Sequence, residues 1–452
     1  RYSTFIKNYG ANQVYKIAAG PNVDDTTWTD VVMRKTGDVI NGIALHYYTS
    51  NSKPAAVIDE KGWFDVIRKT LRMDEIISMH TKVMDRHDPA KKVALIVDEW
   101  GTWHSVEPGT NPSFLFQQNT MRDAIVAASN LNIFHKHNDR VKMTNIAQMV
   151  NVLQAMILTD KKKMVLTPTY HVFEMYKAHQ DAINLPIQLE TPNYEFGQEA
   201  IPSVNASASI TSKGIITISL CNVNPTKNAK VNIKFNSFKN KNISAQILTA
   251  EEMNALNSFD APTKVMPTNF TDFKFTKDEL QLDMPAKSVI VFKLDGQIDS
   301  RIGKAIEVKK VKPGIKYAYY EGILMVLPDF SEMEVLRKGK IDQITIPEEN
   351  SLGDYAVRYS GLIKLPADGF YNFYANADDG CKIYIDGKLI VNNDGRHAPI
   401  EVKGFASLHK GFHRIVVEFF QAGGGAVLET RIEGPGLAKQ IIPANMLFHE
   451  ID

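Results

Sequence analysis

The stretch from Val93 to His104, VALIVDEWGTWH, constrains the fold more than any other part of the sequence. Five consecutive apolar residues end abruptly in Asp98, Glu99 and Trp100. The run is too short for a separate helix and too uniformly apolar for a half-exposed strand, so we expect the central strand of a parallel sheet. Ligands in parallel α/β folds meet side chains at the carboxyl ends of strands. The two carboxylates are therefore candidates for chemistry, the alternative being that they cap the next helix or pair with an arginine.

Strands and helices alternate from Arg1 to about Lys177. The expected strands are Val14–Gly20, Ile40–Tyr48, Val93–Val97 and Met164–Leu166, and the expected helices follow Trp63 and occupy Phe114–Phe134, Ile146–Ile157 and Tyr170–Lys177. A complete (β/α)8 barrel has eight strands and about 250 residues. This segment is too short, and its first and last strands would expose unpaired edges. We therefore predict the C-terminal half of a TIM barrel, with the other strands supplied by upstream sequence or by a separate chain.

The remaining sequence has the character of antiparallel β-structure. Residues 187–294 contain alternating and β-branched runs separated by turn residues, which is typical of a β-sandwich. A polar, basic connection leads to a second strand-rich region, in which the Asp386-Gly387 step predicts a tight hairpin. The predicted organisation is multidomain: a half barrel at 1–177, a β-sandwich at 178–295, a linker at 296–314 and a second β-sandwich at 315–452.

Composition excludes several classes of protein. The chain has 452 residues, a net charge of +1 and 23% charged residues, which gives no electrostatic case for nucleic acid or an anionic membrane as partner. No apolar run approaches the ~20 residues that cross a bilayer. The two cysteines, Cys221 and Cys381, fall in different predicted domains, so we expect no disulfide framework.

Three motifs in order resemble one enzyme family. DEWGTW, with HYYT at 46–49 before it and NIAQMVNVLQA at 145–155 after it, is similar to the second half of the catalytic domain of glycoside hydrolase family 51, the retaining α-L-arabinofuranosidases. The resemblance extends over about Arg1 to Leu294. It implies release of terminal arabinofuranosyl units from polysaccharides or oligosaccharides such as arabinan and arabinoxylan, without a cofactor. It also implies a secreted or periplasmic location, and it is compatible with a homo-oligomer.

A second resemblance covers most of the last 138 residues, which begin at Ile315. The order of motifs around DDGCKIYIDGK resembles the protective-antigen-like β-sandwich that many secreted glycoside hydrolases carry. The resemblance implies carbohydrate binding. Asp378 and Asp379 are either oxygen ligands for Ca²⁺ or part of a polar approach to the hairpin.

The family pattern makes Glu99 the nucleophile. Retaining glycosidases need a second carboxyl group roughly 5 to 5.5 Å away to protonate the leaving oxygen. In the family this group is the Glu of an Asn-Glu motif at the end of the fourth barrel strand, and Arg1–Lys177 contains no such motif. We therefore expect the acid/base residue upstream of Arg1 and a chain that is inactive alone.

Four further residues are candidates for substrate binding. His46 and Tyr48 match family residues near the nucleophile, where an imidazole or phenol can hydrogen-bond the carboxylate or a sugar hydroxyl. Their alternative is a purely structural role at the barrel mouth. Gln148 matches a family glutamine that contacts the sugar, and its alternative is a helix-surface amide. Trp103, with Trp100, would line the sugar pocket, and the alternative for both is core packing.

The sequence gives no metal site. His135 and His137 are one residue apart, but no Cys or third His lies close by, so we expect no metal ligation.

Two other functional classes remain open. The chain is alternatively a non-catalytic carbohydrate-binding fragment, or a related glycosidase such as a xylosidase or endoglucanase, since barrels of this kind host several activities.

Overall fold

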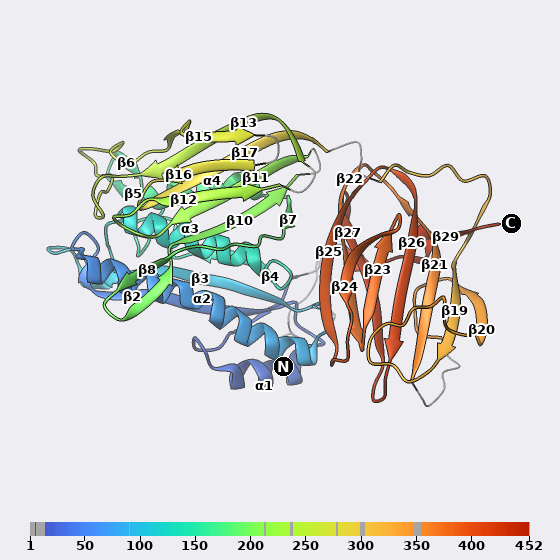
Figure 1. Cartoon of the computed structure of the whole chain (residues 1–452). Helices are drawn as coiled ribbons and strands as arrows, with labels where there is room; N and C mark the ends of the chain where they lie inside the picture. Colours follow the sequence, from blue (N-terminus) through green and yellow to red (C-terminus); the bar gives the residue numbers. More distant parts are fainter. Residues whose placement is uncertain are drawn as a thin grey trace. The chain divides into compact units, whose positions relative to one another are not determined.

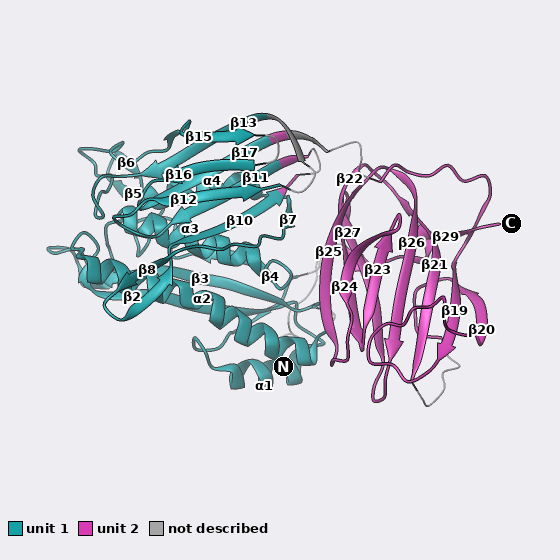
Figure 2. Cartoon of the chain, viewed as in Figure 1, with its two compact units in different colours: residues 1–209, 216–236, 242–294 teal, residues 210–215, 237–241, 295–452 magenta. Residues whose placement is uncertain are grey.

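A computed structural model describes residues 5, 14–89, 91–211, 214–235, 238–276, 279–298, 303–347 and 354–451. The chain forms two compact units (Figure 2). Unit 1 comprises residues 1–209, 216–236 and 242–294, and unit 2 comprises residues 210–215, 237–241 and 295–452. No helix in the described ranges is both long and apolar enough to cross a membrane.

Unit 1 begins with a four-stranded parallel sheet (Figure 1). The strands lie in chain order and are β1 (Ile17–Ala18), β2 (Gly42–Pro54), β3 (Ala94–Ser105) and β4 (Val141–Ile146). Each neighbouring pair is parallel. The connections contain α1 (Thr26–Thr36), α2 (Glu60–His87) and α3 (Met121–Lys136). The predicted alternation of strands and helices is therefore present.

The local sequence explains where the helices begin. The Asp59 carboxylate accepts a 2.7 Å hydrogen bond from the amide of Gly62 at the start of α2, and the buried positions of α2 recur at helical spacing. A capping box formed by Thr120 and Asp123 starts α3. Every residue of α3 from Met121 to Phe134 is buried, because the helix packs between two β-layers.

Two sequence predictions about this region are wrong. The fourth parallel strand is β4, whereas Met164 to Leu166 belongs to β6 (Lys163–Leu166), which pairs antiparallel with β5 (Ile157–Asp160). The stretch predicted as a helix from Ile146 to Ile157 is irregular. Asn151 and Leu153 there have φ of 60° and 49°, which a right-handed helix does not allow. The helix after it does form, as α4 (Pro168–Tyr176).

A sandwich-like pair of sheets completes unit 1. One sheet has six strands in the order β14-β13-β17-β11-β10-β7, and the other has three in the order β12-β16-β15. Their bounds are β7 Ile183–Leu185, β10 Val204–Ile210, β11 Ile215–Asn222, β12 Ala229–Lys234, β13 Phe238–Thr249, β14 Thr268–Asn269, β15 Phe273–Thr276, β16 Glu279–Met284 and β17 Ser288–Ile298. A separate hairpin consists of β8 (Asn193–Phe196) and β9 (Glu199–Pro202).

The parallel sheet and the six-stranded sheet share one hydrophobic core. Buried residues of α2, α3, β3, β11 and β17 belong to a single cluster. The indole of Trp63 in α2 donates a 2.8 Å hydrogen bond to the carbonyl of Val223, just after β11. Cys221 of β11 lies against Ser129 of α3. Figure 1 shows α3 between the two layers.

Unit 2 is built from two antiparallel sheets. The larger follows the order β18-β29-β21-β26-β23-β24, with β19 pairing β21 and β20 pairing β19, and the smaller follows β25-β22-β27-β28. The bounds are β18 Val311–Pro313, β19 Ile315–Glu321, β20 Arg337–Ile341, β21 Tyr355–Leu365, β22 Gly369–Asp378, β23 Cys381–Ile385, β24 Lys388–Asn393, β25 Ile400–Leu408, β26 Gly411–Gln421, β27 Val427–Gly434, β28 Leu437–Ile441 and β29 Leu447–Glu450.

The predicted hairpin in unit 2 is confirmed. Asp386 and Gly387 join β23 to β24 with φ of 49° and 76°, the positive values that a tight hairpin turn requires at both central residues. The end of the predicted linker is also ordered: Gly303 and Ile306 form bridges to Leu408 and Phe412, and β18 pairs with β29.

Candidate active site

Glu99 projects from β3 just after the apolar run of that strand. The strand continues past the apolar run to Ser105, and its alternating pattern buries Trp100 completely while leaving the Glu99 side chain about half exposed (48%). Glu99 lies opposite His46 of the neighbouring strand β2. The carboxylate therefore stands beside the two β2 residues that the sequence marked for this place.

Tyr48 holds the Glu99 carboxylate directly. Its hydroxyl donates a 2.9 Å hydrogen bond to Oε2 of Glu99. Burial raises the pKa of Tyr48 well above its ordinary value, and the hydrogen bond to Glu99 and the charge of its carboxylate raise that pKa further. The phenol therefore stays protonated at neutral pH and remains a donor to Glu99.

The His46 ring lies between two carboxylates. Its Nε2 is 3.2 Å from Oδ1 of Asp98, and its Nδ1 is 3.6 Å from Oε2 of Glu99. Asp98 thus has a specific neighbour, which the sequence alone did not reveal. The arrangement allows Asp98 to fix the orientation of the ring beside Glu99.

The two tryptophans of the motif occupy different environments. The Trp103 ring meets the Tyr48 ring edge-to-face, with 5.1 Å between centroids, and Trp103 is 40% exposed. Trp100 packs in the core against Phe134 and Phe173, at centroid distances of 5.2 and 6.0 Å. Trp103 is therefore beside the candidate nucleophile, whereas core packing accounts for Trp100.

Gln148 lies two residues beyond the end of β4, in an exposed position. The preceding residue, Ala147, donates a backbone hydrogen bond of 2.9 Å to the carbonyl of Trp100, and the amide of Gln148 donates one of 3.1 Å to Val152. These bonds tie the loop to β3 at the carboxyl edge of the sheet. Because the loop is not helical, the alternative of a helix-surface amide is wrong.

Sequence reasoning missed Gln154, whose side chain holds the backbone of β3 by a hydrogen bond. Its side chain is fully buried, and its Oε1 accepts a 2.8 Å hydrogen bond from the amide of Thr102. Its Nε2 donates to the carbonyl of Asp123 at 2.7 Å and to the hydroxyl of Thr169 at 3.1 Å. Gln154 stands in the same NIAQMVNVLQA stretch as Gln148, and nothing in the letters distinguishes the buried amide from the exposed one.

Asp123 is the centre of this buried network. It accepts hydrogen bonds from the hydroxyls of Thr102 and Thr120 at 2.7 and 2.8 Å, and its Oδ1 lies 3.0 Å from Nε2 of His104. Burial by itself raises the pKa of this carboxyl, but the hydrogen bond from His104 and the charges of His104 and Arg122 outweigh burial and lower the pKa well below its ordinary value. The network therefore fixes the backbone just beyond Glu99.

The remaining sequence candidates have protein partners. His137 Nε2 is 2.5 Å from Oδ1 of Asp74, and His135 Nδ1 is 2.8 Å from the Ser207 hydroxyl. Within the described ranges no group of three or more His, Cys, Asp or Glu side chains is arranged to hold a metal.

The Asp379 carboxylate in unit 2 also has hydrogen-bond partners within the protein. It accepts backbone hydrogen bonds from His397 at 3.1 Å and from Ala422 at 2.7 Å. These bonds join the approach to the β23–β24 hairpin to two neighbouring loops.

Two parts of the chain match known protein families. Residues 98–288 match the family described as Alpha-L-arabinofuranosidase C-terminal domain, and residues 312–444 match the PA14 domain. An intracellular exo-alpha-L-arabinofuranosidase of Bacteroides ovatus is 44% identical over 300 residues, which cover 65% of this chain and 58% of that protein. A relative from Halalkalibacterium halodurans, an intracellular exo-alpha-(1->5)-L-arabinofuranosidase, is 26% identical over 250 residues, covering 51% of this chain and 48% of that protein.

Solved structures give the same picture. The GH51 arabinofuranosidase from Xanthomonas axonopodis pv. citri is 45% identical with a TM-score of 0.64, over 65% of this chain and 60% of that one. An α-L-arabinofuranosidase from Thermotoga maritima is 27% identical with a TM-score of 0.52, over 61% and 57%. The chain thus spans roughly half to three fifths of the length of these relatives.

The expected secreted or periplasmic location is wrong. The relatives from Bacteroides ovatus and Halalkalibacterium halodurans are both named as intracellular proteins, as are those from Streptomyces lividans and Bacillus subtilis. The location inferred from the resemblance is therefore corrected. The chain is thus similar to the α-L-arabinofuranosidase C-terminal domain family over residues 98–288 and to the PA14 domain family over residues 312–444.

Proposed function

We propose that this chain forms part of a retaining, exo-acting α-L-arabinofuranosidase that releases terminal arabinofuranosyl units from arabinose-containing polysaccharides or oligosaccharides. The observation that carries the proposal is the half-exposed carboxylate of Glu99, which follows the apolar run of the parallel strand β3 and accepts the Tyr48 hydrogen bond from the neighbouring strand β2. The 44% identity to a protein named as an exo-alpha-L-arabinofuranosidase supports the substrate class.

In the proposed reaction Glu99 attacks the anomeric carbon of the terminal sugar. The bond to the leaving oxygen breaks as the glycosyl-enzyme ester forms, and water then hydrolyses that ester. The Tyr48 hydroxyl and the His46 ring keep the attacking oxygen in one orientation, which reduces the cost of reaching the transition state. Trp103, on β3, and Gln148, in the loop after β4, would contact the sugar.

Protonation of the leaving oxygen needs a second carboxyl group roughly 5 to 5.5 Å from Glu99. Asp98 is the adjacent carboxylate, but its Oδ1 lies 3.2 Å from Nε2 of His46. We therefore assign the acid/base role to a residue outside the described ranges.

The same proposal includes a partial barrel. Four parallel strands in chain order, joined by α1, α2 and α3, are what half of a (β/α)8 barrel requires. Among the described strands of this sheet, β1 and β4 each pair on one side only, so further strands would complete the barrel at these edges. Residues 1–177 would then supply the half barrel, 178–295 the sandwich packed on it, 296–314 a connection and 315–452 the PA14-like domain.

The test is the reaction of Glu99→Ala in the full-length protein with an aryl α-L-arabinofuranoside. Turnover should fall by several orders of magnitude, because no glycosyl-enzyme can form. Azide should restore release of the aryl group and give a glycosyl azide of inverted anomeric configuration, since the small anion attacks from the face that Glu99 occupied.

Asp98→Ala is the matched control for this experiment. It removes the neighbouring carboxylate and should lower turnover through His46, but azide should not restore the loss. Unchanged turnover in Glu99→Ala, or an azide product with retained configuration, would overturn the role of Glu99.

A further inference from the structure

Three adjacent strands of unit 2 place cationic side chains on one face. β19 lies between β20 and β21, and both pairings are antiparallel. Residues two apart on a strand share a face of the sheet. Two cross-strand rows therefore lie side by side on this face, with Lys340, Lys316 and Ser360 in one row and Lys338, Ala318 and Arg358 in the other.

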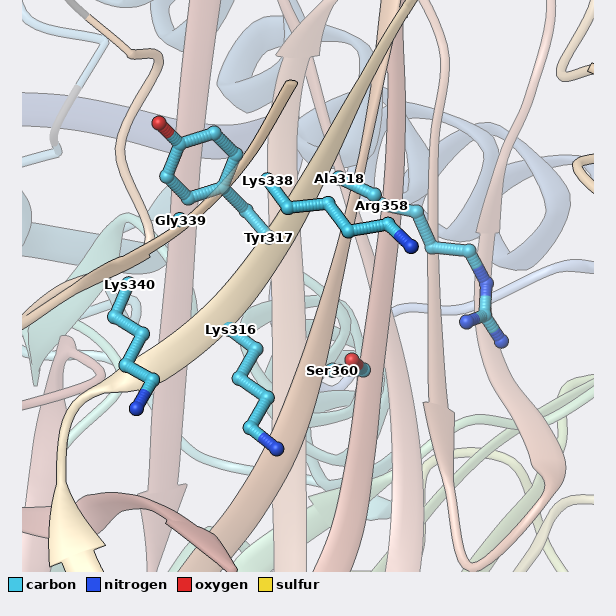
Figure 3. Close-up of a pocket in the computed structure, with 8 residues that line it drawn as sticks. All are labelled: Lys316, Tyr317, Ala318, Lys338, Gly339, Lys340, Arg358 and Ser360. Carbon is cyan, nitrogen blue, oxygen red and sulfur yellow. The ribbon is translucent and has the colours of Figure 1, made fainter. Parts of the chain in front are cut away.

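The two rows line a surface hollow of about 390 Å³, which we call the basic hollow (Figure 3). Ala318 and Ser360 have short side chains, so they form its floor between the long cationic ones. Tyr317 also lines the hollow, but its ring belongs to the opposite side of the sheet: it packs against the core and covers Gly339, where an added Cβ would come within 2.6 Å of the ring. The hollow therefore presents cations and one hydroxyl.

The charges of the basic hollow are not explained by ion pairing. None of the described residues that line it is acidic. Within the described part of the chain, Lys316, Lys338 and Lys340 form no salt bridge, whereas Arg358 Nε lies 3.1 Å from Oε1 of Glu418. Lys316 and Lys340 also stand directly opposite each other, and such like-charged neighbours destabilise a sheet.

Protection of a sheet edge explains only part of the pattern. Lysines commonly stand on edge strands, where they discourage pairing with another chain. This reason applies to Lys338 and Lys340, because in the described structure β20 pairs only with β19. It does not apply to Lys316 and Arg358, which stand on the interior strands β19 and β21.

We propose that the basic hollow binds the carboxylate groups of an acidic polysaccharide. Several cations spread over two rows match repeated anions along a polymer better than they match one small ion. The hollow offers no aromatic face of the kind on which nucleic-acid bases stack. The net charge of the whole chain is +1, so the attraction is local to this face. The inference that a polysaccharide carries these carboxylates rests on the proposed function. The inference that the hollow attracts anions rests on the hollow alone.

The experiment measures binding of polygalacturonate to the full chain at low ionic strength. The triple variant Lys316→Ala, Lys338→Ala, Lys340→Ala should bind about tenfold more weakly, the scale expected for the loss of three exposed ion pairs. Binding by the unmodified chain should also weaken as salt is added. The matched control is Lys388→Ala, Lys403→Ala, Lys410→Ala, which removes the same charge from exposed lysines of unit 2 outside the hollow and should bind normally.

Several results would overturn the proposal. No binding by the unmodified chain, or equal losses in the two triple variants, would exclude a site at the hollow. Tighter binding to DNA of equal charge than to polygalacturonate would exclude the polysaccharide assignment. Thermal unfolding reports whether each variant folds, and if the triple variant does not, Lys338→Glu alone should still weaken binding.

Failure of this proposal is distinguishable from failure of the proposed function. Glu99→Ala should leave polygalacturonate binding unchanged. The triple lysine variant should release the aryl group from a small arabinofuranoside at the normal rate.

Discussion

The hydroxyl of Tyr48 donates a 2.9 Å hydrogen bond to Oε2 of Glu99, so a residue of β2 fixes the orientation of a side chain of β3. A hydrogen bond to a charged group contributes about 1.5–3 kcal/mol. Tyr48→Phe should therefore lower kcat for an aryl arabinofuranoside by about 10- to 100-fold.

Tyr47→Phe is the matched control for that prediction. It removes a hydroxyl one residue earlier, on the other face of β2, where Tyr47 donates to the carbonyl of Lys69 at 2.8 Å. It should change stability but leave kcat within a factor of two or so. Equal kcat values for the two variants would show that the Tyr48 hydroxyl does not act on Glu99.

Substitution by leucine should lower the free energy of unfolding at Gln154 but leave it nearly unchanged at Gln148. Gln154→Leu leaves the amide of Thr102 buried without its acceptor, which should lower the free energy of unfolding by about 1–3 kcal/mol. Gln148→Leu changes an exposed side chain, so unfolding should shift by less than about 0.5 kcal/mol. If Gln148 contacts the sugar, its variant should instead raise KM. Denaturant unfolding and steady-state kinetics on both variants test the pair, and a stability loss confined to Gln148→Leu would contradict it.

Two buried histidines should make unit 1 sensitive to acid. Burial lowers the pKa of His135 to about 4, and burial together with the charge of His135 lowers the pKa of His179 to about 3. In the unfolded chain the two histidines take up protons near pH 6.5, whereas in the folded chain they stay neutral. The stability of the fold is therefore undiminished above about pH 6.5 and falls as the pH is lowered towards 4 and 3. Each histidine should cost about 2 kcal/mol at pH 5 relative to pH 7.5.

His179→Gln tests this pH dependence. The difference in free energy of unfolding between pH 7.5 and pH 5 should shrink by about 2 kcal/mol, even though losing the contacts with Ser209 and Ser219 lowers stability at both values. His87→Gln, at a partly exposed ring that lies 2.9 Å from Asp30, should not reduce the difference. A difference that is the same in the unmodified chain and in His179→Gln would exclude a titration at this site.

A buried charge cluster should govern the stability of unit 2. Glu401 is 2.7 Å from Arg431 and pairs also with Lys439, and the side chains of Glu401 and Arg431 are 7% and 5% exposed. Glu401→Gln keeps the shape of the side chain but removes the buried charge that faces Lys439 and Arg431, of which Arg431 keeps its pair with Glu429. It should cost about 3 kcal/mol in unfolding free energy.

Glu450→Gln is its control. It breaks an exposed pair with Arg414 at 3.4 Å and should cost well under about 1 kcal/mol. Thermal or denaturant unfolding of both variants decides the matter, and similar losses would mean that burial does not strengthen the Glu401 cluster.

The local sequence was enough to predict elements whose structure depends mainly on neighbouring residues. The five apolar residues before Asp98 predicted a buried strand there, although β3 does not end at the carboxylates and continues to Ser105, and helical spacing after Trp63 predicted α2. The Asp386-Gly387 step predicted its own turn. In each case the residues that carry the signal are also the ones that adopt the structure.

The fourth parallel strand could not be read locally. Apolar and polar residues alternate along Val141–Ile146. The place of this strand is determined by pairing with β3, in which Met143 pairs with Ile96, 47 residues earlier in the chain. Met164–Leu166 has the apolar character of a central strand, yet Met164 is 62% exposed in a small hairpin. Apolar character alone did not distinguish a sheet centre from a hairpin.

Contacts between strands were likewise hidden in the sequence. The approach of His46 to Asp98 depends on the β2–β3 register, which includes an irregularity between Ala44 and His46. The basic hollow joins Lys316 to Lys338 and Lys340 only through the β19–β20 pairing. No motif marks either arrangement, because each arises from residues that are distant along the chain.

The common core of unit 1 has a consequence for any attempt to divide the protein. A polypeptide cut after residue 177 would lose the Val223 carbonyl that receives the Trp63 indole, together with the Cys221 side chain that lies against α3. The side of α3 that faces the sandwich, which is buried from Met121 to Phe134 in the intact unit, would face water. The parallel sheet with its helices and the six-stranded sheet are therefore expected to unfold together, and neither should persist as a separate folded piece.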